Sequence, residues 1–483
     1  MAQTYLSEKM IAALDSDAYD VPLDFPRDLM DKSRTTVADH LRGVCAFFGN
    51  PDRQVVEILD ATSTILVSKR NEENISVAMD VTKASLELYI SSNGTDLANA
   101  GKHLDRVWET LKKIKEIHGS RKSMQEVERF TSNEVEDEIP QLKVERDNLG
   151  RLIYEFSIEK LMACFERETA RKIRTLIQEV VDRPSNRTDQ SVPEWIYYVD
   201  SRYMGLIAAM DLVFRAIHKY KAAKSTIDQH RALDLLVSFI TLAHSNAVDG
   251  KEGVAGTKPQ SLYNICSFIL EREFDVRMPD AFGRFWDEVF SLHIAYIHLL
   301  RLAFSPSSAR FLDSQLKFTI IQSREEDKRI LEYDLERDID FRTLFMDDLE
   351  YDDTSKESTP NYTYSICLQR FARKGVPAHH YGKYAPHSEC NLLAYLVNHH
   401  VDAYAYIGVS DLSCIGCWLY FRVYNKLAKK KSLPIYDIRG SHSKTTGKWV
   451  KPVLLDDDLE QTLERDLVAA SYDEFLILRY KND

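Results

Sequence analysis

Four side chains near the carboxyl end of the chain have the types and the spacing of a catalytic zinc site. His387 and Glu389 stand two positions apart, and Cys414 and Cys417 form a C-x-x-C pair that begins 27 residues after His387. One imidazole and two thiolates give zinc three protein ligands and leave its fourth position for water. A carboxylate close to the metal, here Glu389, then carries protons. The pattern indicates metal-assisted hydrolysis.

The surrounding sequence places both pairs at the start of a helix. Apolar residues recur at helical spacing through 391–398, which puts His387 in the first turn of a helix. The segment 403–409 is β-rich, and a turn leads from it to Cys414. Residues 418–428 are helical again. A helix N-terminus lowers the pKa of a thiol and so favours the thiolate that zinc needs.

This arrangement resembles the zinc-dependent cytidine deaminase-like superfamily, which acts on bases in nucleotides and nucleic acids. More narrowly, the sequence around the motifs is similar to a fungal-rich branch of this superfamily. The similar segments are Pro386–Leu393, Tyr406–Cys417, Arg439–Ser443 and Trp449–Pro452. The resemblance covers only the last part of the chain. It implies an α/β/α domain with a mixed sheet, and Zn²⁺ as the cofactor. It also implies that the metal ligands are His387, Cys414 and Cys417, and that Glu389 is the catalytic acid and base.

Two positions depart from the usual pattern of that superfamily. Ser413 precedes the first cysteine, where proline is usual, and Ser388 lies inside H-x-E, where alanine is common. The first change alters the loop that enters the second helix, and the second adds a hydroxyl beside the site. We expect both serines to contact the substrate.

Other interpretations of the same residues stay open. A C-x-x-C pair alone is typical of a structural or redox site, and Cys390 would close a structural zinc site if it were a fourth ligand. Cys390 follows Glu389 directly, however, and would point away from His387 on the helix. The alternatives to a deaminase of nucleic acid or nucleotides are a free-nucleoside deaminase and a catalytically vestigial, zinc-stabilised protein-interaction module. The intact Glu389 weighs against the last.

Length and composition predict a soluble globular protein of two or three domains, because the chain has 483 residues, 44% hydrophobic and 29% charged. A net charge of −12 argues against a surface coated in nucleic-acid contacts. Seven scattered cysteines are not a disulfide scaffold, so we expect an intracellular protein, cytoplasmic or nuclear. No signal peptide and no membrane span are expected.

The fold class predicted is α+β and multidomain, with a large all-α region before the deaminase-like domain. Residues 1–305 are expected to form a helical domain. Its sequence does not indicate a role, and one expectation is that it recruits a protein partner. Residues 306–483 are expected to form the zinc domain. Within it, 316–322 and 329–335 have the pattern of a β-hairpin, and an acidic insertion or loop occupies about 340–360. Alternatively, that hairpin belongs to the helical domain and the first catalytic strands lie within 362–383.

Positive charge is concentrated beyond the zinc residues. Between Cys414 and Lys451 there are nine Lys or Arg and a single acid, Asp437. One interpretation is a rim that attracts phosphate, with Arg439, His442 and Lys444 after a short strand at 435–438. Tyr436, His442 and Trp449 are available to stack on or border a base. The other interpretation is that Lys429–Lys431 are solvated at the end of a helix, where they interact favourably with its dipole and need no ligand. Together with the resemblance, the rim predicts hydrolytic deamination of a base, cytosine favoured over adenine, in nucleic acid or a nucleotide.

Overall fold

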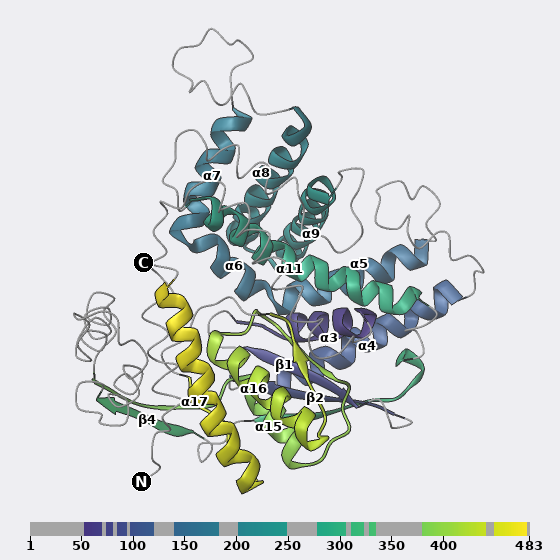
Figure 1. The fold of residues 1–483 in the computed structure, drawn as a ribbon. Coiled ribbons are helices and arrows are strands. Elements are labelled where there is room, and N and C mark those ends of the chain that lie inside the picture. Colours follow the sequence, from purple (N-terminus) through teal and green to yellow (C-terminus); the bar gives the residue numbers. More distant parts are fainter. Residues whose placement is uncertain are drawn as a thin grey trace, which may run out of the picture. The chain divides into compact units, whose positions relative to one another are not determined.

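Two compact units make up the chain in the computed structural model (Figure 1). The sheet unit combines residues 1–63, 72–97 and 316–483, and the helical unit combines 64–71 and 98–315. The structure describes residues 53–69, 74–80, 85–93, 97–119, 140–182, 201–248, 278–305, 311–322, 328–334, 379–440 and 449–480. Within those ranges, none of the helices is long and apolar enough to cross a membrane.

The helical unit is built from long amphipathic helices around an aromatic core. Phe214 lies against Phe285 and Trp286, with ring centroids 5.9 and 6.0 Å away, and Phe165 meets Phe214 edge-on at 5.1 Å. These rings are buried because each helix turns one apolar face inward. The helices are α4 (Leu97–Gly119), α5 (Pro140–Phe156), α6 (Ile158–Glu166), α7 (Glu168–Val181), α8 (Ser201–Ala222), α9 (Thr226–Val248) and α11 (Met278–Phe304).

In the part of the sheet unit that the structure describes, a mixed sheet of five strands has the order β3-β2-β1-β6-β7. The central strand β1 pairs antiparallel with β2 on one side and with β6 on the other, whereas β2–β3 and β6–β7 are parallel pairs. The strands are β1 (Ile75–Asp80), β2 (Leu86–Ser92), β3 (Leu316–Gln322), β6 (Tyr406–Val409) and β7 (Asp437–Ile438).

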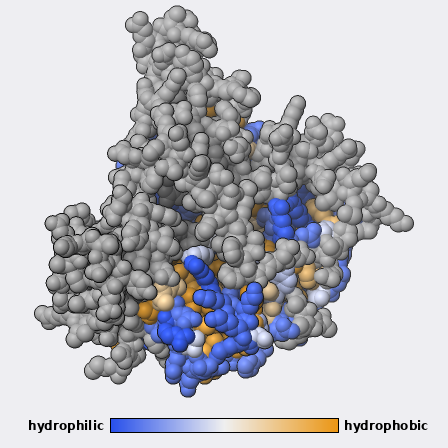
Figure 2. Space-filling model, viewed as in Figure 1, coloured by the Kyte–Doolittle hydropathy of each residue, from blue (hydrophilic) through white to orange (hydrophobic). Residues whose placement is uncertain are grey.

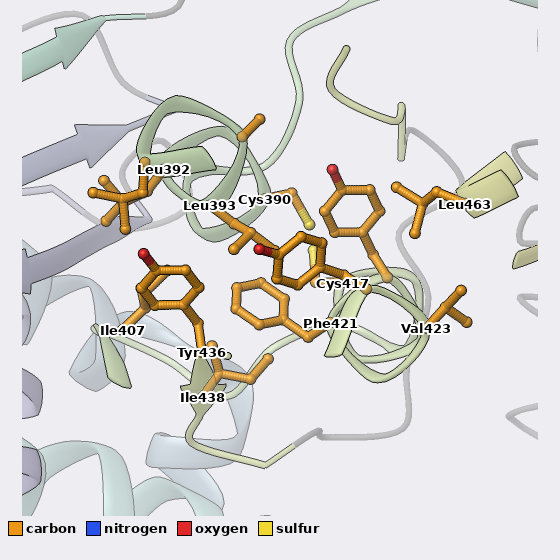
Figure 3. Close-up of a cluster of buried hydrophobic side chains, with 14 of the residues drawn as sticks. Cys390, Leu392, Leu393, Ile407, Cys417, Phe421, Val423, Tyr436, Ile438 and Leu463 are labelled. Carbon is orange, nitrogen blue, oxygen red and sulfur yellow. The ribbon is translucent and has the colours of Figure 1, made fainter. Parts of the chain in front are cut away.

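Helices cover both faces of this sheet. On one face, α15 (Ser388–Asn398), α16 (Ile415–Lys431) and α17 (Asp457–Tyr480) enclose a buried apolar cluster that includes Ile407 of β6 and Leu463 of α17 (Figure 3). On the other face lies α3 (Arg53–Ile65), whose Leu59 backbone touches β6. Hydrophilic residues cover much of the outward surface visible over α15 and α16 (Figure 2), as expected for helices that bury one side.

The predicted fold class is confirmed: a helical region accompanies a mixed sheet with helices on it. The predicted extent of the helical region needs a correction, because 75–92 is not helical. These residues form β1 and β2, the strands that pair with β6 and β3 of the carboxyl-terminal region. Helix-like periodicity elsewhere in 1–305 does not reveal two short strands whose residues are almost all buried.

The predicted β-hairpin is wrong in its pairing, although both strands exist. β3 pairs with β2, and β4 (Arg329–Asp334) pairs antiparallel with β5 (His379–Tyr384) in a separate two-stranded sheet. Of the alternative stretch 362–383, the structure describes only residues from 379 on, and the strand β5 found there does not join the main sheet. The acidic insertion at about 340–360 lies outside the described residues.

Candidate metal centre

Two helix starts bring the predicted ligands together. His387 is the N-cap of α15, in extended backbone, and its carbonyl accepts the Asn391 amide at 2.8 Å. Cys414 is the N-cap of α16, where its sulfur accepts the Cys417 amide at 3.4 Å. Because the N-cap and the third residue after it lie on the same side of the first turn, both cysteine sulfurs face one point.

The three ligand atoms form a compact triangle. His387 Nδ1 lies 3.5 Å from Cys414 Sγ and 3.3 Å from Cys417 Sγ, and the two sulfurs are 3.4 Å apart. Zinc bonds of about 2.3 Å to sulfur and about 2.0 Å to nitrogen require edges of roughly 3.5–3.8 Å in a tetrahedron. The triangle therefore fits a metal after shifts of a few tenths of an ångström. Among the described residues, it is the only group of three or more His, Cys, Asp or Glu with this proximity.

Burial makes thiolates at the triangle costly unless a cation accompanies them. Burial raises the pKa of both the Cys414 and the Cys417 thiol well above the ordinary value. Burial also lowers the pKa of His387, but the nearby Cys414 sulfur and the Glu389 carboxylate outweigh it and raise that pKa to about 9. A divalent cation would offset the desolvation of two thiolates and displace the proton from the imidazole. The donor set of one nitrogen and two sulfurs suits zinc.

Cys390 is beside the triangle but not part of it. It is fully buried, and its sulfur lies next to that of Cys417 within the apolar cluster (Figure 3). Its sulfur nevertheless falls outside the group whose ligand atoms all lie within 4.8 Å of one another. Burial raises the pKa of this thiol to about 11, as for a structural cysteine in an apolar setting. Three described residues, and not Cys390, therefore make up the group that could hold a metal ion.

Glu389 is buried and close to the ligands. It is 5% exposed, and its charge contributes to the raised pKa values of His387 and Cys417. Its Oε2 accepts a hydrogen bond from Ser388 Oγ at 3.3 Å. Ser388 is itself buried, and its hydroxyl lies 2.8 Å from that of Ser76 in β1. The carboxylate is thus buried beside the triangle, with one of its oxygens bonded to Ser388.

The other residues expected to contact substrate are placed less uniformly. Ser413 is buried, and its amide bonds the carbonyl of Gly440 at 3.2 Å, which ties the loop before Cys414 to the end of β7. Arg439, next to Gly440, is exposed. His442 and Lys444 lie outside the described residues.

Trp449 and Tyr436 are corrections to the sequence prediction. Both are only 1% exposed and belong to the core cluster, so neither ring presents a face on which a base could stack. Tyr436 donates its hydroxyl proton to the Val401 carbonyl at 3.2 Å, and the Trp449 ring packs 6.3 Å from that of Tyr420. An aromatic residue beside a site motif is more readily recruited to the core than to a ligand.

The predicted basic rim is smaller than the sequence suggested. Lys451 is fully buried, and its ammonium pairs with Glu460 and, at 3.4 Å, with Glu464 of α17. The lysines of 429–431 occupy the last turn of α16, where they favour the helix dipole, and Lys431 pairs with Asp458. The second interpretation of the lysine triplet is therefore the one that the structure supports. Among the described residues of this rim, Arg439 is an exposed cation next to the loop that enters the centre.

Ser76 is the residue near the centre that the sequence did not reveal. It lies 312 positions before Ser388, in a strand whose residues are all buried. A serine in a short buried strand carries no local signal of a role, and only the pairing of β1 with β6 brings it to the site.

The two helices that start on the ligands, together with the buried acid, resemble the site of zinc-dependent deaminases in order and spacing. Consistent with this, residues 386–453 match the family model of the OTT_1508-like deaminases (OTT_1508_deam). The matched segment contains His387, Glu389, Cys414 and Cys417. It does not include β1, β2 or β3, which precede it in the sequence. Comparison with curated proteins and with solved structures gives no match.

Proposed function

We propose that the protein is a zinc-dependent hydrolytic deaminase of a nucleobase in nucleic acid or a nucleotide, with cytosine favoured over adenine. The observation that carries the proposal is the triangle of His387, Cys414 and Cys417 with Glu389 buried beside it. A structural site has no need of that carboxylate. The family match to deaminases supports the reaction class. Cytosine rests on the superfamily resemblance alone.

In this proposal, three residues bind the metal and Glu389 transfers protons. A zinc ion held by His387, Cys414 and Cys417 would lower the pKa of a bound water from about 15.7 toward about 7. Glu389 takes a proton from the attacking water and passes it to the ring nitrogen and then to the departing amine. Water adds at C4 of the cytosine, the C4–N bond breaks and ammonia leaves, so cytosine and water become uracil and ammonia.

The choice of a phosphate-bearing substrate rests on Arg439. Its guanidinium is exposed beside Gly440, whose carbonyl is bonded to the residue before Cys414. A cation in that place would attract a phosphate next to the base.

The four described cysteines are all thiols, which supports a reducing, cytoplasmic or nuclear setting. We also propose that the helical unit recruits a protein partner.

The test compares the zinc-loaded full-length protein with its Glu389→Gln variant. Ammonia release and base conversion are measured with cytidine, CMP, adenosine, AMP, single-stranded DNA, duplex DNA and RNA. We expect turnover of a cytosine-containing phosphate probe and a loss of about a thousandfold in the variant, with zinc retained, because only the proton carrier is removed. Glu57→Gln, on the partly exposed surface of α3, is the matched control and should leave turnover unchanged.

Each unfavourable outcome has a distinct meaning. A wild-type protein that holds zinc and converts no probe would contradict the deaminase assignment. Full activity in Glu389→Gln would show that the proton carrier is misassigned. Turnover of cytidine alone would make the free-nucleoside alternative the correct one.

A further inference from the structure

Two strands from the amino-terminal half of the chain contribute buried hydroxyls beneath the first turn of α15. Ser76 of β1 and Ser91 of β2 are directly opposite each other in the antiparallel ladder, and both are 0% exposed. Each bonds a side chain on α15: Ser76 reaches Ser388 at 2.8 Å, and Ser91 accepts from Asn391 Nδ2 at 3.3 Å. The first turn of this helix therefore rests on polar contacts, although its later turns pack through leucines.

The direction of the hydrogen bonds follows from counting protons. Ser388 has a single hydroxyl proton, which it donates to Glu389 Oε2 at 3.3 Å. Its oxygen is then an acceptor, so the 2.8 Å contact must be a donation from Ser76. The result is a chain of two hydrogen bonds that starts on the sheet and ends on the carboxylate.

A carboxylate needs such a contact to have a defined position. Glutamate has three rotatable side-chain bonds, and proton transfer requires its oxygens to lie within hydrogen-bond reach of the reacting atoms. Ser388 is fixed by its place in the helix and by Ser76, so it restricts where Oε2 can lie. The Ser91 hydroxyl is as buried as that of Ser76, but its partner Asn391 is partly exposed and the bond does not involve Glu389.

We propose that Ser388, held by Ser76 of β1, is the positioning residue for the Glu389 carboxylate. The inference rests on the proposed function, in which Glu389 carries protons. It extends that function to a part of the chain outside the segment 386–453 that matches the family model. The strand β1 then has a task in the site as well as in the sheet.

The test uses the full-length, zinc-loaded protein and its Ser388→Ala, Ser76→Ala and double variants. Ser91→Ala is the matched control, because it removes an equally buried hydroxyl and an equivalent contact to α15. Values of kcat and KM are measured with cytidine, CMP and a single-stranded oligonucleotide that contains one cytosine. Crystal structures of the wild type, Ser388→Ala and Ser91→Ala give the position of the Glu389 carboxylate independently of activity.

The expected result is a loss confined to kcat. Ser388→Ala should lower kcat about tenfold and Ser76→Ala about threefold, with KM within about twofold of the wild type. The double variant should match Ser388→Ala, because Ser76 acts only through Ser388. Ser91→Ala should keep kcat within about twofold. In the crystals, the Glu389 carboxylate should shift or split in Ser388→Ala and stay in place in Ser91→Ala.

The structural readout separates this inference from the function on which it rests. A wild type that converts no probe contradicts the proposed function, whereas the carboxylate position still tests the positioning. A carboxylate that keeps its place in Ser388→Ala overturns the inference, and so does an equal fall of kcat in Ser91→Ala and Ser76→Ala. If Ser388→Ala fails to fold, the comparison of Ser76→Ala with Ser91→Ala carries the same test.

Discussion

Buried ionisable side chains of the sheet unit differ in whether they have a partner. Lys451 has two carboxylates beside it, and Glu389 accepts a bond from Ser388. Asp437 of β7 is only 3% exposed, and its Oδ1 has no hydrogen-bond partner among the described residues. A charge that is buried without a partner is costly, so the neutral form is favoured. Burial accordingly raises the pKa of Asp437 to about 7.

The raised pKa of Asp437 predicts that the free energy of unfolding falls as the pH rises. The folded state holds a proton that the unfolded chain releases near pH 3.8, so stability is lost between about pH 4 and pH 7. Asp437→Asn removes this dependence, so its stability relative to the wild type should rise by about 3 kcal/mol from pH 4.5 to pH 8. Urea unfolding at both pH values measures the difference.

Asp458→Asn is the control for this prediction. The Asp458 carboxylate is exposed, and Lys431 lowers its pKa. The variant should therefore leave the pH dependence of the free energy of unfolding unchanged in the same window. Equal pH profiles for the wild type and Asp437→Asn would contradict the account of the buried acid.

At the residue scale, the sequence predicted those site residues whose proximity depends on local spacing. H-x-E and C-x-x-C each lie within one helical turn, so their side chains are brought together by the first turns of α15 and α16. The roles of Ser76 and Trp449 could not be predicted in this way. Ser76 reaches the site through sheet pairing, and the burial of Trp449 depends on packing between segments that are distant in sequence.

At the scale of elements, α3 approaches β6 unusually closely. A side chain at Gly408 would place its Cβ 2.4 Å from the Leu59 carbonyl carbon and 2.5 Å from its oxygen. The same contact is fixed by Asp60, whose carboxylate accepts from the Tyr406 hydroxyl at 3.0 Å and from the Val409 amide at 3.2 Å. The absence of a side chain at 408 therefore lets the helix lie on the strand that leads to Cys414.

Gly408→Ala should consequently destabilise the sheet unit by about 3 kcal/mol or more, since backbone atoms cannot yield to a new methyl group. Gly150→Ala in α5 is the contrasting control. There the new Cβ meets Val237 Cγ1 at an ordinary 3.7 Å, and alanine is the better helix former by about 0.5–1 kcal/mol. Thermal unfolding should show a lower midpoint for the first variant and an unchanged or higher one for the second. Equal midpoints would rule out the close packing.

The strands show which features of an element can be read from sequence. Alternating residues located β3 and β4 to within one residue, because that period is local. Their partners could not be assigned, since β3 pairs with a strand about 230 positions earlier and β4 with one across an interval that the structure does not describe. Proximity in sequence favoured a hairpin that does not form.

At the scale of the whole molecule, the sheet unit is discontinuous in sequence. Its central strand, β1, comes from residues 75–80, whereas its proposed ligands come from 387–417. The larger part of the helical unit, residues 98–315, occupies the sequence between β2 and β3. The boundary predicted at 305 and 306 therefore divides a sheet, because period changes along a chain mark elements and not the unit to which they belong.

A fragment of residues 306–483 should fail to fold alone. It lacks β1 and β2, so β3 and one edge of β6 would lose their backbone partners and the core cluster would lose one wall. Co-expression with residues 1–97 should restore zinc binding and a cooperative unfolding transition. Calorimetry and metal analysis of the two preparations provide the comparison. A fragment that unfolds cooperatively and holds one zinc by itself would show that β1 is dispensable.

The most direct measurement of the central claim is the zinc content of the reconstituted full-length protein and its variants by mass spectrometry. The wild type should hold one zinc per chain, as should Glu389→Gln and Cys390→Ala, because neither residue is a ligand. His387→Ala, Cys414→Ser and Cys417→Ser should hold essentially none while the helical unit stays folded. Zinc retained after the loss of Cys414 or Cys417, or lost with Cys390, would contradict a centre of three ligands with an open fourth position.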